Sequence, residues 1–345
     1  MQDRYGHRIS YLRVSITDRC NERCTYCMPQ ELQEWLPREE ILTFEETLRL
    51  VRIAAELGVS KVRVTGGEPL TRRDIVHFIA QIPKISGIKS LGLSTNGTLL
   101  TRAVAGGGDA GQPGSTSPAT TMAFALHEAG VQSVNISLDT LDRDVYSKIT
   151  GRDLHAKVLE GIDTAIAVGF DQIKLNTVLM RGRNEDQLVP LIEFAASREL
   201  ILRFIEMMPV STTDVLSEDN FMSMLEAKRL IESVYGSLIP ETEFRTNGPA
   251  TYYQIPGSKQ RIGFIGAMTN LHFCENCNKL RLTCDGKLRP CLGSYLEFDI
   301  MKPLQAGASD EELKQFFLDV VDRKPEQHDF RDNYQPNRKM IAIGG

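Results

Sequence analysis

Three cysteines near the start of the chain have a spacing that predicts chemistry at a metal. They follow one another as Cys20-x3-Cys24-x2-Cys27, and no fourth cysteine or histidine stands within a few residues. A structural zinc ion needs four protein ligands, and a cubane iron–sulfur cluster is usually held by four thiolates. Three thiolates leave one metal position open for a substrate or cofactor, so the spacing favours a reactive centre over a structural clip.

A second group of cysteines lies between residues 274 and 291. Cys274, Cys277 and Cys291 would form another open trio, whereas adding Cys284 would supply the four ligands of a structural zinc site. Asp285-Gly286 directly follows Cys284 and predicts a tight hairpin turn. The spacing alone leaves open whether Cys284 faces a metal.

Composition and charge narrow the classes of protein that fit this chain. It has 345 residues, with 40 Lys and Arg against 45 Asp and Glu, which gives a net charge of -5. This balance argues against a broad nucleic-acid-binding surface. No apolar run reaches the length of a membrane span, and the first residues lack the apolar core of a signal peptide. We therefore expect a cytoplasmic protein, in which seven cysteines favour metal binding over disulfides.

Short β-rich runs alternate with helical patterns through the first two thirds of the chain. The expected strands are Leu12–Ile16, Lys61–Thr65, Ser90–Ser94, Ser133–Leu138, Gln172–Leu179 and Ile201–Glu206. The first expected helix begins at Thr43, which starts a capping box, and ends at Gly58. The other expected helices cover roughly Arg73–Gln81, Met122–Ala129, His155–Val168 and Asp186–Glu199. Repeated strand–helix units predict a parallel sheet with right-handed crossovers, here an α/β fold that curls into a partial (β/α)6 barrel of the TIM type.

The pattern changes twice along the chain. A Gly-rich stretch at residues 105–120 reads as a flexible surface insertion. After about residue 240 come short strands, at Tyr252–Ile255, Arg261–Ile265 and Lys279–Thr283, and a helix near Asp310–Asp322. We therefore expect a barrel domain over residues 1–235 and a smaller C-terminal module over residues 236–345.

The expected strands carry polar residues on one face, which buried parallel strands seldom do. Side chains alternate across a strand, so Arg13, Arg63, Lys174 and Arg203 would all point to the same side of the sheet. Six strands with this pattern cannot all be solvated edges. The alternation predicts a wide, polar lumen that is locally cationic and holds an anion, plausibly a phosphorylated one. The first cysteine trio follows the first strand, at the end where barrel active sites lie.

Taken together, the motifs resemble the radical S-adenosylmethionine (SAM) superfamily and, within it, the molybdenum cofactor biosynthesis protein A family of GTP 3',8-cyclases. Two motifs are general to the superfamily: the first trio with Tyr26 before its last cysteine, and Thr65-Gly66-Gly67-Glu68-Pro69 after the second strand. The narrower resemblance rests on an ordered set that includes Ser94-Thr95-Asn96-Gly97, Asn135-Ile136-Ser137-Leu138-Asp139, Arg203-Phe204-Ile205-Glu206-Met207-Met208, the second trio with Arg281-Leu282, and Gly344-Gly345.

The resemblance implies two [4Fe-4S] clusters and SAM as cofactors. Cys20, Cys24 and Cys27 would hold the first cluster, whose open iron chelates SAM. The residues implied to contact SAM are Tyr26, Gly67, Ser137 and Met208. A 5'-deoxyadenosyl radical released from SAM would take the hydrogen from the ribose C3' of GTP, and C3' would then join C8 of guanine. The product would be (8S)-3',8-cyclo-7,8-dihydroguanosine 5'-triphosphate, a precursor of molybdopterin.

The resemblance also implies the substrate site. Cys274, Cys277 and Cys291 would hold a second cluster whose open iron binds the guanine of GTP, with Cys284 left out. The implied GTP contacts are Arg13, Arg63, Ser94, Lys174, Lys279, Leu280 and Arg281. Gly344 and Gly345 would enter the site and assist catalysis. Lys279 departs from the family pattern, which commonly has Arg there, and a lysine lacks the two-pronged geometry of a guanidinium.

Other readings of the sequence remain open at this stage. A radical SAM enzyme that modifies a peptide would also carry cysteines near the C-terminus, and a zinc-stabilised binding module would use all four late cysteines. For the cyclase, the resemblance implies an electron-donor protein and, downstream, cyclic pyranopterin monophosphate synthase as partners. No nucleic acid and no membrane are expected, and the sequence leaves a monomer and a homodimer equally open.

Overall fold

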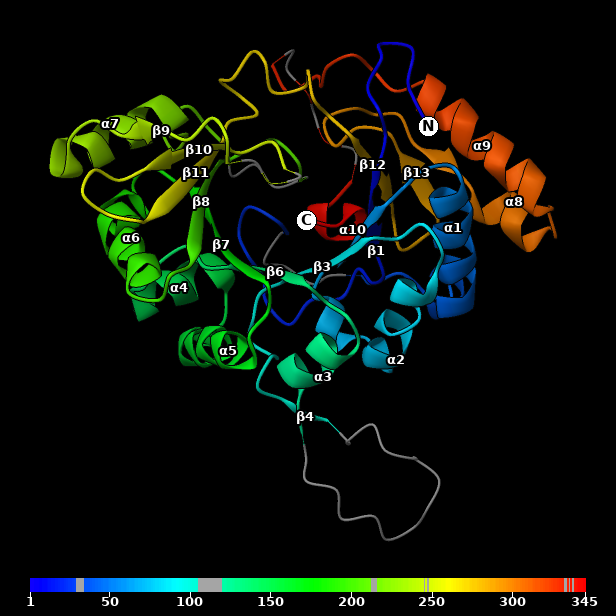
Figure 1. Cartoon of the computed structure of the whole chain (residues 1–345), viewed down its shortest axis with the longest axis horizontal. Helices are drawn as coiled ribbons and strands as arrows, with labels where there is room; N and C mark the ends of the chain where they lie inside the picture. Colours follow the sequence, from blue (N-terminus) through cyan, green and yellow to red (C-terminus); the bar gives the residue numbers. More distant parts are fainter. Residues whose placement is uncertain are drawn as a thin grey trace, which may run out of the picture.

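A computed structural model describes residues 1–28, 34–104, 120–211, 216–244, 246, 248–331, 334, 336 and 338–345. Its centre is a curved sheet of strands with helices on its outer side (Figure 1). Six parallel strands form the middle of this sheet in the order β1-β2-β3-β6-β7-β8. They are β1 (Tyr11–Ser15), β2 (Lys61–Thr65), β3 (Ser90–Thr95), β6 (Ser133–Ser137), β7 (Gln172–Leu179) and β8 (Ile201–Glu206). The predicted partial barrel and its strand set are confirmed.

Helices α1 to α6 cover the outside of the arc and bury its apolar face (Figure 1). They are α1 (Phe44–Glu56), α2 (Ile75–Ile79), α3 (Met122–Glu128), α4 (Arg143–Thr150), α5 (His155–Val168) and α6 (Leu188–Ala196). The Thr43 hydroxyl accepts from the Glu46 backbone N–H and the Glu46 carboxylate accepts from the Thr43 N–H, so the predicted capping box begins α1. The sequence reading missed α4, which begins after the Asp142 cap.

The later part of the chain extends both edges of the same sheet. On one side β12 (Lys279–Leu282) pairs in parallel with β1, followed by β13 (Lys287–Arg289) and β14 (Phe298–Asp299). On the other side β11 (Arg261–Ile265) pairs in parallel with β8, followed by β10 (Thr251–Gln254) and β9 (Ile239–Pro240). The domain boundary expected at residue 236 stays a prediction. Strands from before and after this residue belong to the same sheet, so the sheet itself marks no boundary there. Gly286, with φ +67, makes the predicted turn between β12 and β13.

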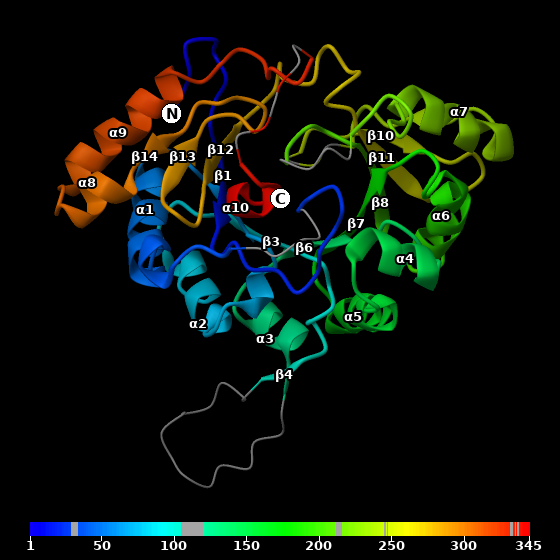
Figure 2. The ribbon, with the colours of Figure 1, turned by 180° about the vertical axis from the view of Figure 1, so that it is seen from behind.

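The four late helices in the described part of the chain lie in three different places. Helices α8 (Met301–Gln305) and α9 (Asp310–Asp322) lie beside α1, and α7 (Met224–Tyr235), which the sequence reading missed, lies near α6 at the opposite edge (Figure 1). The short α10 (Met340–Ile343) and the chain end lie inside the arc, as the view from behind also shows (Figure 2). The last residues therefore reach the concave side of the sheet.

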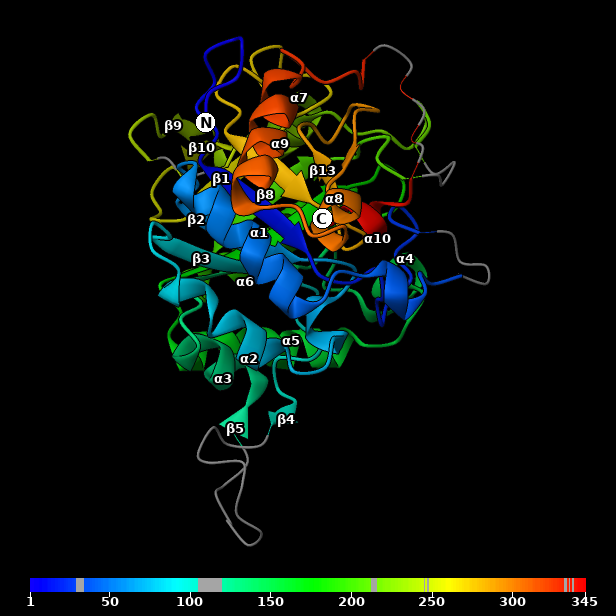
Figure 3. The same ribbon diagram turned by 90° about the vertical axis from the view of Figure 1, so that its right-hand side faces the viewer.

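The Gly-rich insertion at 105–120 falls almost wholly outside the described residues. Its flanks form a small antiparallel pair, β4 (Ala103–Val104) with β5 (Thr120–Thr121), which stands away from the barrel (Figure 3). Within the described ranges, no helix combines the length and apolar character needed to cross a membrane.

Candidate active site

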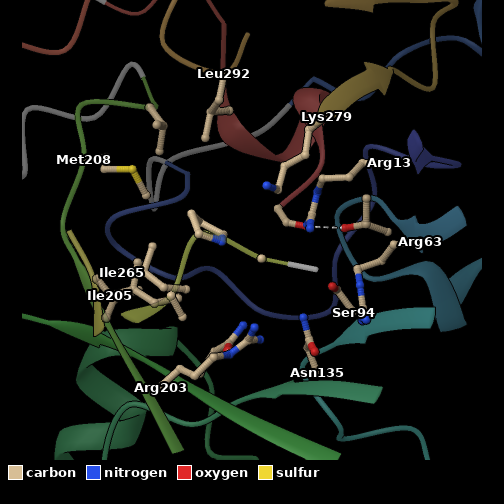
Figure 4. A pocket seen from close by; sticks show the side chains of 18 of the residues that line it. Arg13, Arg63, Ser94, Asn135, Arg203, Ile205, Met208, Ile265, Lys279 and Leu292 are labelled. Atoms are coloured by element: carbon tan, nitrogen blue, oxygen red, sulfur yellow. Dashed lines mark hydrogen bonds between the residues drawn. The ribbon is translucent and has the colours of Figure 1, made fainter. Parts of the chain in front are cut away.

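The concave side of the sheet encloses one large cavity of about 900 Å³. Both cysteine trios line it, together with polar residues from all six central strands and the last glycine of the sequence. Figure 4 shows side chains from opposite walls, such as Arg13 and Arg203, facing the same space. The cavity brings together almost every residue that the sequence analysis assigned to a site.

The first trio lies in the loop that follows β1. The backbone N–H groups of Cys27 and Met28 both donate to the Cys24 carbonyl, at 2.9 and 3.0 Å, which folds the loop into a turn. Burial raises the pKa of all three thiols, that of Cys27 to about 12. A buried neutral thiol becomes a thiolate ligand when a cation such as iron binds it.

Gly66 and Gly67 hold the next loop against this one. The Gly67 N–H donates to the Thr17 carbonyl at 2.7 Å, and the Glu68 N–H donates to the Arg19 carbonyl at 2.8 Å. A Cβ on Gly66 would lie 2.7 Å from the Thr17 oxygen, and one on Gly67 would overlap the Arg19 backbone. Only glycine permits this approach, so the motif packs the loop after β2 against the loop that carries the cysteines.

Buried carboxylates surround the first trio. Burial raises the pKa of Glu22 and of Glu68 to about 7, and that of Asp139 to about 6. The Tyr26 hydroxyl donates to Asp139 at 2.8 Å, and the Tyr146 hydroxyl donates to Glu22. The bond to Asp139 fixes the Tyr26 ring beside the cysteines, and the three carboxyl groups give this end of the cavity an acidic character.

The second trio lies at the other end of the strands. Cys277 precedes β12, whose first residue pairs with the first residue of β1, while the first trio follows the last residue of β1. Burial raises the pKa of Cys274, and that of Cys291 to about 11. Burial alone would also raise the pKa of Cys277, but the charges of Lys324 and Lys279 outweigh it and lower that pKa below its usual value. Because the two trios lie at opposite ends of the paired strands β1 and β12, they face each other along the cavity.

The donor sets fit clusters. Each trio supplies three thiols to one wall of the cavity. Among the residues that the structure describes, no three His, Cys, Asp or Glu side chains converge as a site for a single metal ion would require. A cubane cluster has no such requirement, because each thiolate binds an iron of its own.

Strand register places the cationic side chains next to one another on the cavity wall. Arg13 pairs with Arg63 on β2 and with Arg281 on β12. On the other wall Asn135 pairs with Lys174, and Asn176 with Arg203. The lining cations are Arg13, Lys61, Arg63, Lys174, Arg203, Lys279 and Arg281.

These cations are buried at a cost that an anionic ligand would offset. Burial, followed by the neighbouring charges of Arg203 and Arg63, lowers the pKa of Lys174 to about 6. Burial also lowers the pKa of Arg203 to about 10 and that of Arg281 to about 9. A polyanion in the cavity would stabilise the charged forms and raise these pKa values again.

Two of the guanidiniums are held in fixed positions. Arg63 donates to the Tyr11 hydroxyl at 2.8 Å, to the Leu93 carbonyl at 2.5 Å and to the Ser133 hydroxyl at 2.8 Å. A Cβ on Gly92 would lie 2.5 Å from the Arg63 guanidinium, so this glycine makes room for it. Arg203 donates to the Asn176 side-chain oxygen at 2.9 Å.

The last two residues of the sequence end between the cationic strands. Arg281 donates to the Gly344 carbonyl at 2.6 Å, and Thr65 donates to the Gly345 oxygen at 2.6 Å. Arg13 also donates to Gly345. Gly344 has φ +89, and a Cβ there would lie 2.9 Å from both Ser15 and Thr65. Both its backbone conformation and its surroundings require glycine.

Three residues weighed in the sequence analysis do not line the cavity. The Leu280 side chain is buried in the hydrophobic core, on the opposite face of β12 from Lys279 and Arg281. Gly344 reaches the site only through its carbonyl. Cys284 is buried beside Ser15 and away from the second trio.

Sequence reasoning also left several lining residues out of the site. The sequence analysis gave Lys61 and Asn135 no role in a site, and gave Arg203 only a place in the cationic lumen. Their alternation with apolar neighbours was the signal that could have assigned them. Phe244 and Tyr252, which line the cavity and pack edge to face, carried no such signal.

Comparison with known proteins gives consistent similarities over the whole chain. The profile of the radical SAM superfamily matches residues 14–195, and that of Molybdenum Cofactor Synthesis C matches residues 200–330. The chain is 42% identical over 346 residues to a GTP 3',8-cyclase of Thermodesulfovibrio yellowstonii, and 42% identical over 345 residues to one of Moorella thermoacetica. Each alignment covers 100% of both sequences.

Solved structures show the same fold at low sequence identity. The crystal structure of Streptococcus suis SuiB bound to S-adenosylmethionine aligns with a TM-score of 0.62 at 15% identity, over 98% of this chain and 78% of that one. The structure of anSMEcpe with bound AdoMet aligns with a TM-score of 0.57 at 14% identity, over 93% of this chain and 82% of that one.

Proposed function

Because this chain belongs to the radical SAM superfamily and, within it, to the GTP 3',8-cyclases, we propose that its two cysteine trios and cationic cavity form one active site for GTP. The enzyme cyclises GTP to (8S)-3',8-cyclo-7,8-dihydroguanosine 5'-triphosphate in molybdenum cofactor biosynthesis. The observation that carries the assignment of residues is the single cavity, which is lined by both trios and by seven cations from five strands.

Cys20, Cys24 and Cys27 bind the first [4Fe-4S] cluster, which supplies the electron that cleaves SAM. Tyr26, Gly67, Ser137 and Met208 contact the cofactor. The acidic surroundings of this trio support the assignment, since the amine and sulfonium groups of SAM are cationic. The Tyr26 ring is held by Asp139, and Gly67, which lines the cavity, allows the loop after β2 to pack against the cysteine loop.

Cys274, Cys277 and Cys291 would hold a second [4Fe-4S] cluster, which would supply a binding position for the guanine of GTP. The buried position of Cys284 beside Ser15, outside the cavity lining, supports leaving it out of the ligand set. Zinc held by all four late cysteines would require Cys284 to turn out of the core, where its side chain is 1% exposed.

Arg13, Arg63, Ser94, Lys174, Lys279 and Arg281 bind GTP. Leu280 is not counted among these contacts, because its side chain belongs to the core and the residue does not line the cavity. A triphosphate is the polyanion that seven clustered cations favour, and charge-assisted hydrogen bonds from guanidiniums are the strong ones. We add Lys61, Asn135 and Arg203 to these contacts on the same ground.

Gly344 and Gly345 position the substrate by holding Arg13 and Arg281. The backbone oxygens of the two glycines orient these guanidiniums from inside the cavity. These two glycines also fill part of the space between the strands, which excludes water from the reacting groups.

Cleavage of SAM needs one electron, so we propose a low-potential electron-donor protein as a partner. Cyclic pyranopterin monophosphate synthase would take the product. Both partners fit a cytoplasmic enzyme.

Anaerobic reconstitution tests the assignment of both clusters and the substrate together. We expect about eight irons and eight acid-labile sulfides per chain, as two cubane clusters require, and conversion of GTP to the cyclised product with consumption of SAM, measured by mass spectrometry. Zinc without sulfide at the late cysteines would overturn the second cluster. An enzyme with both clusters that cleaves SAM and leaves GTP unchanged would overturn the substrate.

A further inference from the structure

Lys324 is a buried cation whose surroundings set it apart from the other basic residues. It follows α9 and is only 3% exposed. Its ammonium donates to the Pro290 carbonyl and to the Lys279 carbonyl at 3.4 Å, and its charge lowers the pKa of Cys277. In the part of the chain that the structure describes, Lys324 forms no ion pair with a carboxylate. By contrast, the fully buried Arg289 pairs with Glu297 at 2.8 Å.

A buried charge needs a partner of opposite charge. Removing an ammonium from water costs several kcal/mol unless an anion or well-placed acceptors compensate. Two carbonyl oxygens supply only partial negative charge. The groups near Lys324 that can become anions are the thiols of the second trio, since its charge acts on Cys277, Cys274 and Cys291 together.

The bonds of Lys324 also join the two segments that carry this trio. Pro290 directly precedes Cys291, and Lys279 stands two residues after Cys277. One ammonium therefore connects the segment before β12 to the segment after β13. Lys324 contributes both a mechanical link and a positive charge to the same site.

We infer that Lys324 is the resident counter-charge of the second iron–sulfur cluster, which it holds in place and whose reduction potential it raises. This inference rests on the second cluster proposed above. A cation near the cluster sulfurs stabilises the reduced state, because reduction adds one electron to an anionic centre. Lys324 is thus a positioning residue for the iron that binds the substrate, without itself touching GTP.

The test isolates the second cluster in the full-length chain. A Cys20→Ala/Cys24→Ala/Cys27→Ala variant leaves only the second trio, and anaerobic reconstitution is followed by iron and sulfide analysis. The potential is then measured by dithionite titration with mediators and electron paramagnetic resonance, where dithionite supplies one electron per cluster and no bond breaks. In this background we compare Lys324→Gln, Lys324→Arg and Lys324→Met, with Lys287→Gln as the control, since Lys287 pairs with Asp299 in the same part of the chain.

Loss of the Lys324 charge and loss of its hydrogen bonds to the two segments should have different effects on the potential and on the iron content. Lys324→Gln keeps a hydrogen-bond donor but no charge, so we expect it to retain iron while its equilibrium constant for reduction falls at least about tenfold, which is about 59 mV for one electron. Lys324→Arg should keep the wild-type potential, and Lys324→Met, without donor or charge, should lose most of its iron. Lys287→Gln should match the parent in both measurements.

Each contrary result is decisive. If Lys324→Gln retains its iron at the parent's potential, Lys324 is a structural residue and the inference fails. If Lys324→Gln loses its iron, iron retained by Lys324→Arg supports the counter-charge, and iron lost from both overturns it. If the parent background with Lys324 intact binds no iron and sulfide, the second cluster itself is wrong and the inference falls with it.

Discussion

The two cysteine trios line one cavity in opposite electrostatic surroundings. Glu22, Glu68 and Asp139 lie around the first trio, whereas Lys279 and Lys324 lie against the second. Both trios have three thiols, so ligand type does not distinguish them. The difference teaches that, in the proposed site, the surrounding charges would set the role of each trio, since an acidic end suits cationic SAM and a basic end suits an anionic nucleotide.

The largest effect should come from removing one cysteine at each end. Cys24→Ala should lose the first cluster and reduce SAM cleavage to background. Cys277→Ala should lose the second cluster and abolish GTP cyclisation while SAM cleavage continues, because the first trio stays intact. Iron content and 5'-deoxyadenosine formation measure the difference. Equal loss of SAM cleavage in both variants would show that the trios do not act separately.

Deleting Gly344 and Gly345 should impair GTP cyclisation at the basic end of the cavity and leave both cysteine trios able to bind iron. We expect GTP cyclisation to fall by about 100- to 1000-fold, as for loss of a positioning hydrogen bond in a water-excluded site, because Arg13 and Arg281 lose their backbone acceptors. Iron content and the thermal midpoint should not change. Cyclisation at the wild-type rate would reject a role for the tail.

Arg13→Ala should weaken the basic wall without affecting the acidic end. Loss of one charged contact to the triphosphate should lower kcat/KM for GTP by about 10- to 100-fold, with cluster content unchanged. Arg198→Ala is the matched control, since Arg198 forms an exposed ion pair with Asp163 at 3.0 Å, far from the cavity. Loss of iron in Arg13→Ala would assign Arg13 a structural role.

The two ends should also respond to pH in opposite directions in the cluster-free protein. Burial raises the pKa of Asp139 from 3.8 to about 6, so folding takes up a proton and the free energy of unfolding falls as pH rises through this window. Burial lowers the pKa of Lys174 from 10.5 to about 6, so folding releases a proton and the free energy of unfolding rises as pH increases from about 6 to 10.5.

Single substitutions separate these two pH effects. Asp139→Asn should remove the fall in the free energy of unfolding, by about 3 kcal/mol across its window, and Lys174→Met should remove the rise, by about 6 kcal/mol across its window. Urea unfolding at a series of pH values measures both. Curves that stay parallel to the wild type would show that neither group titrates as its surroundings imply.

The smallest effect concerns Lys279 at the basic end. Lys279→Arg should lower KM for GTP about two- to fivefold, because a guanidinium forms two parallel bonds to phosphate where an ammonium forms a point contact. SAM cleavage without GTP should not change. A higher KM would show that the wall is shaped for lysine at this position.

The strands and helices of the central barrel were predictable from the sequence because patterns within a few neighbouring residues define them. β2 and α5 occur at the predicted bounds, since apolar alternation, capping residues and glycines mark them within a few positions. Alternation also placed Arg13, Arg63 and Lys174 on the cavity wall. The same rule could have assigned the Leu280 side chain to the core, because its neighbours on both sides face the cavity.

What the sequence could not predict depends on contacts between distant residues. No local pattern shows that β12 pairs with β1 and β11 with β8, so the late strands looked like a separate module. Lys324 follows a helix with charged residues around it, which is typical of a solvated surface. Only its packing against the segments of Cys277 and Cys291 makes it buried.

The pairing of β1 with β12 has a consequence for how the protein is made. The loop of the first trio leaves the ribosome early, but the strand that closes its side of the barrel follows only after residue 279. At ordinary synthesis rates of about 5–20 residues per second, β1 waits roughly 10 to 50 s with one edge unpaired. During that interval the nascent chain carries exposed metal-binding thiols next to an open sheet edge. Conditions that shorten the wait, or chaperones that cover the edge, should therefore raise the yield of protein that can be loaded with iron.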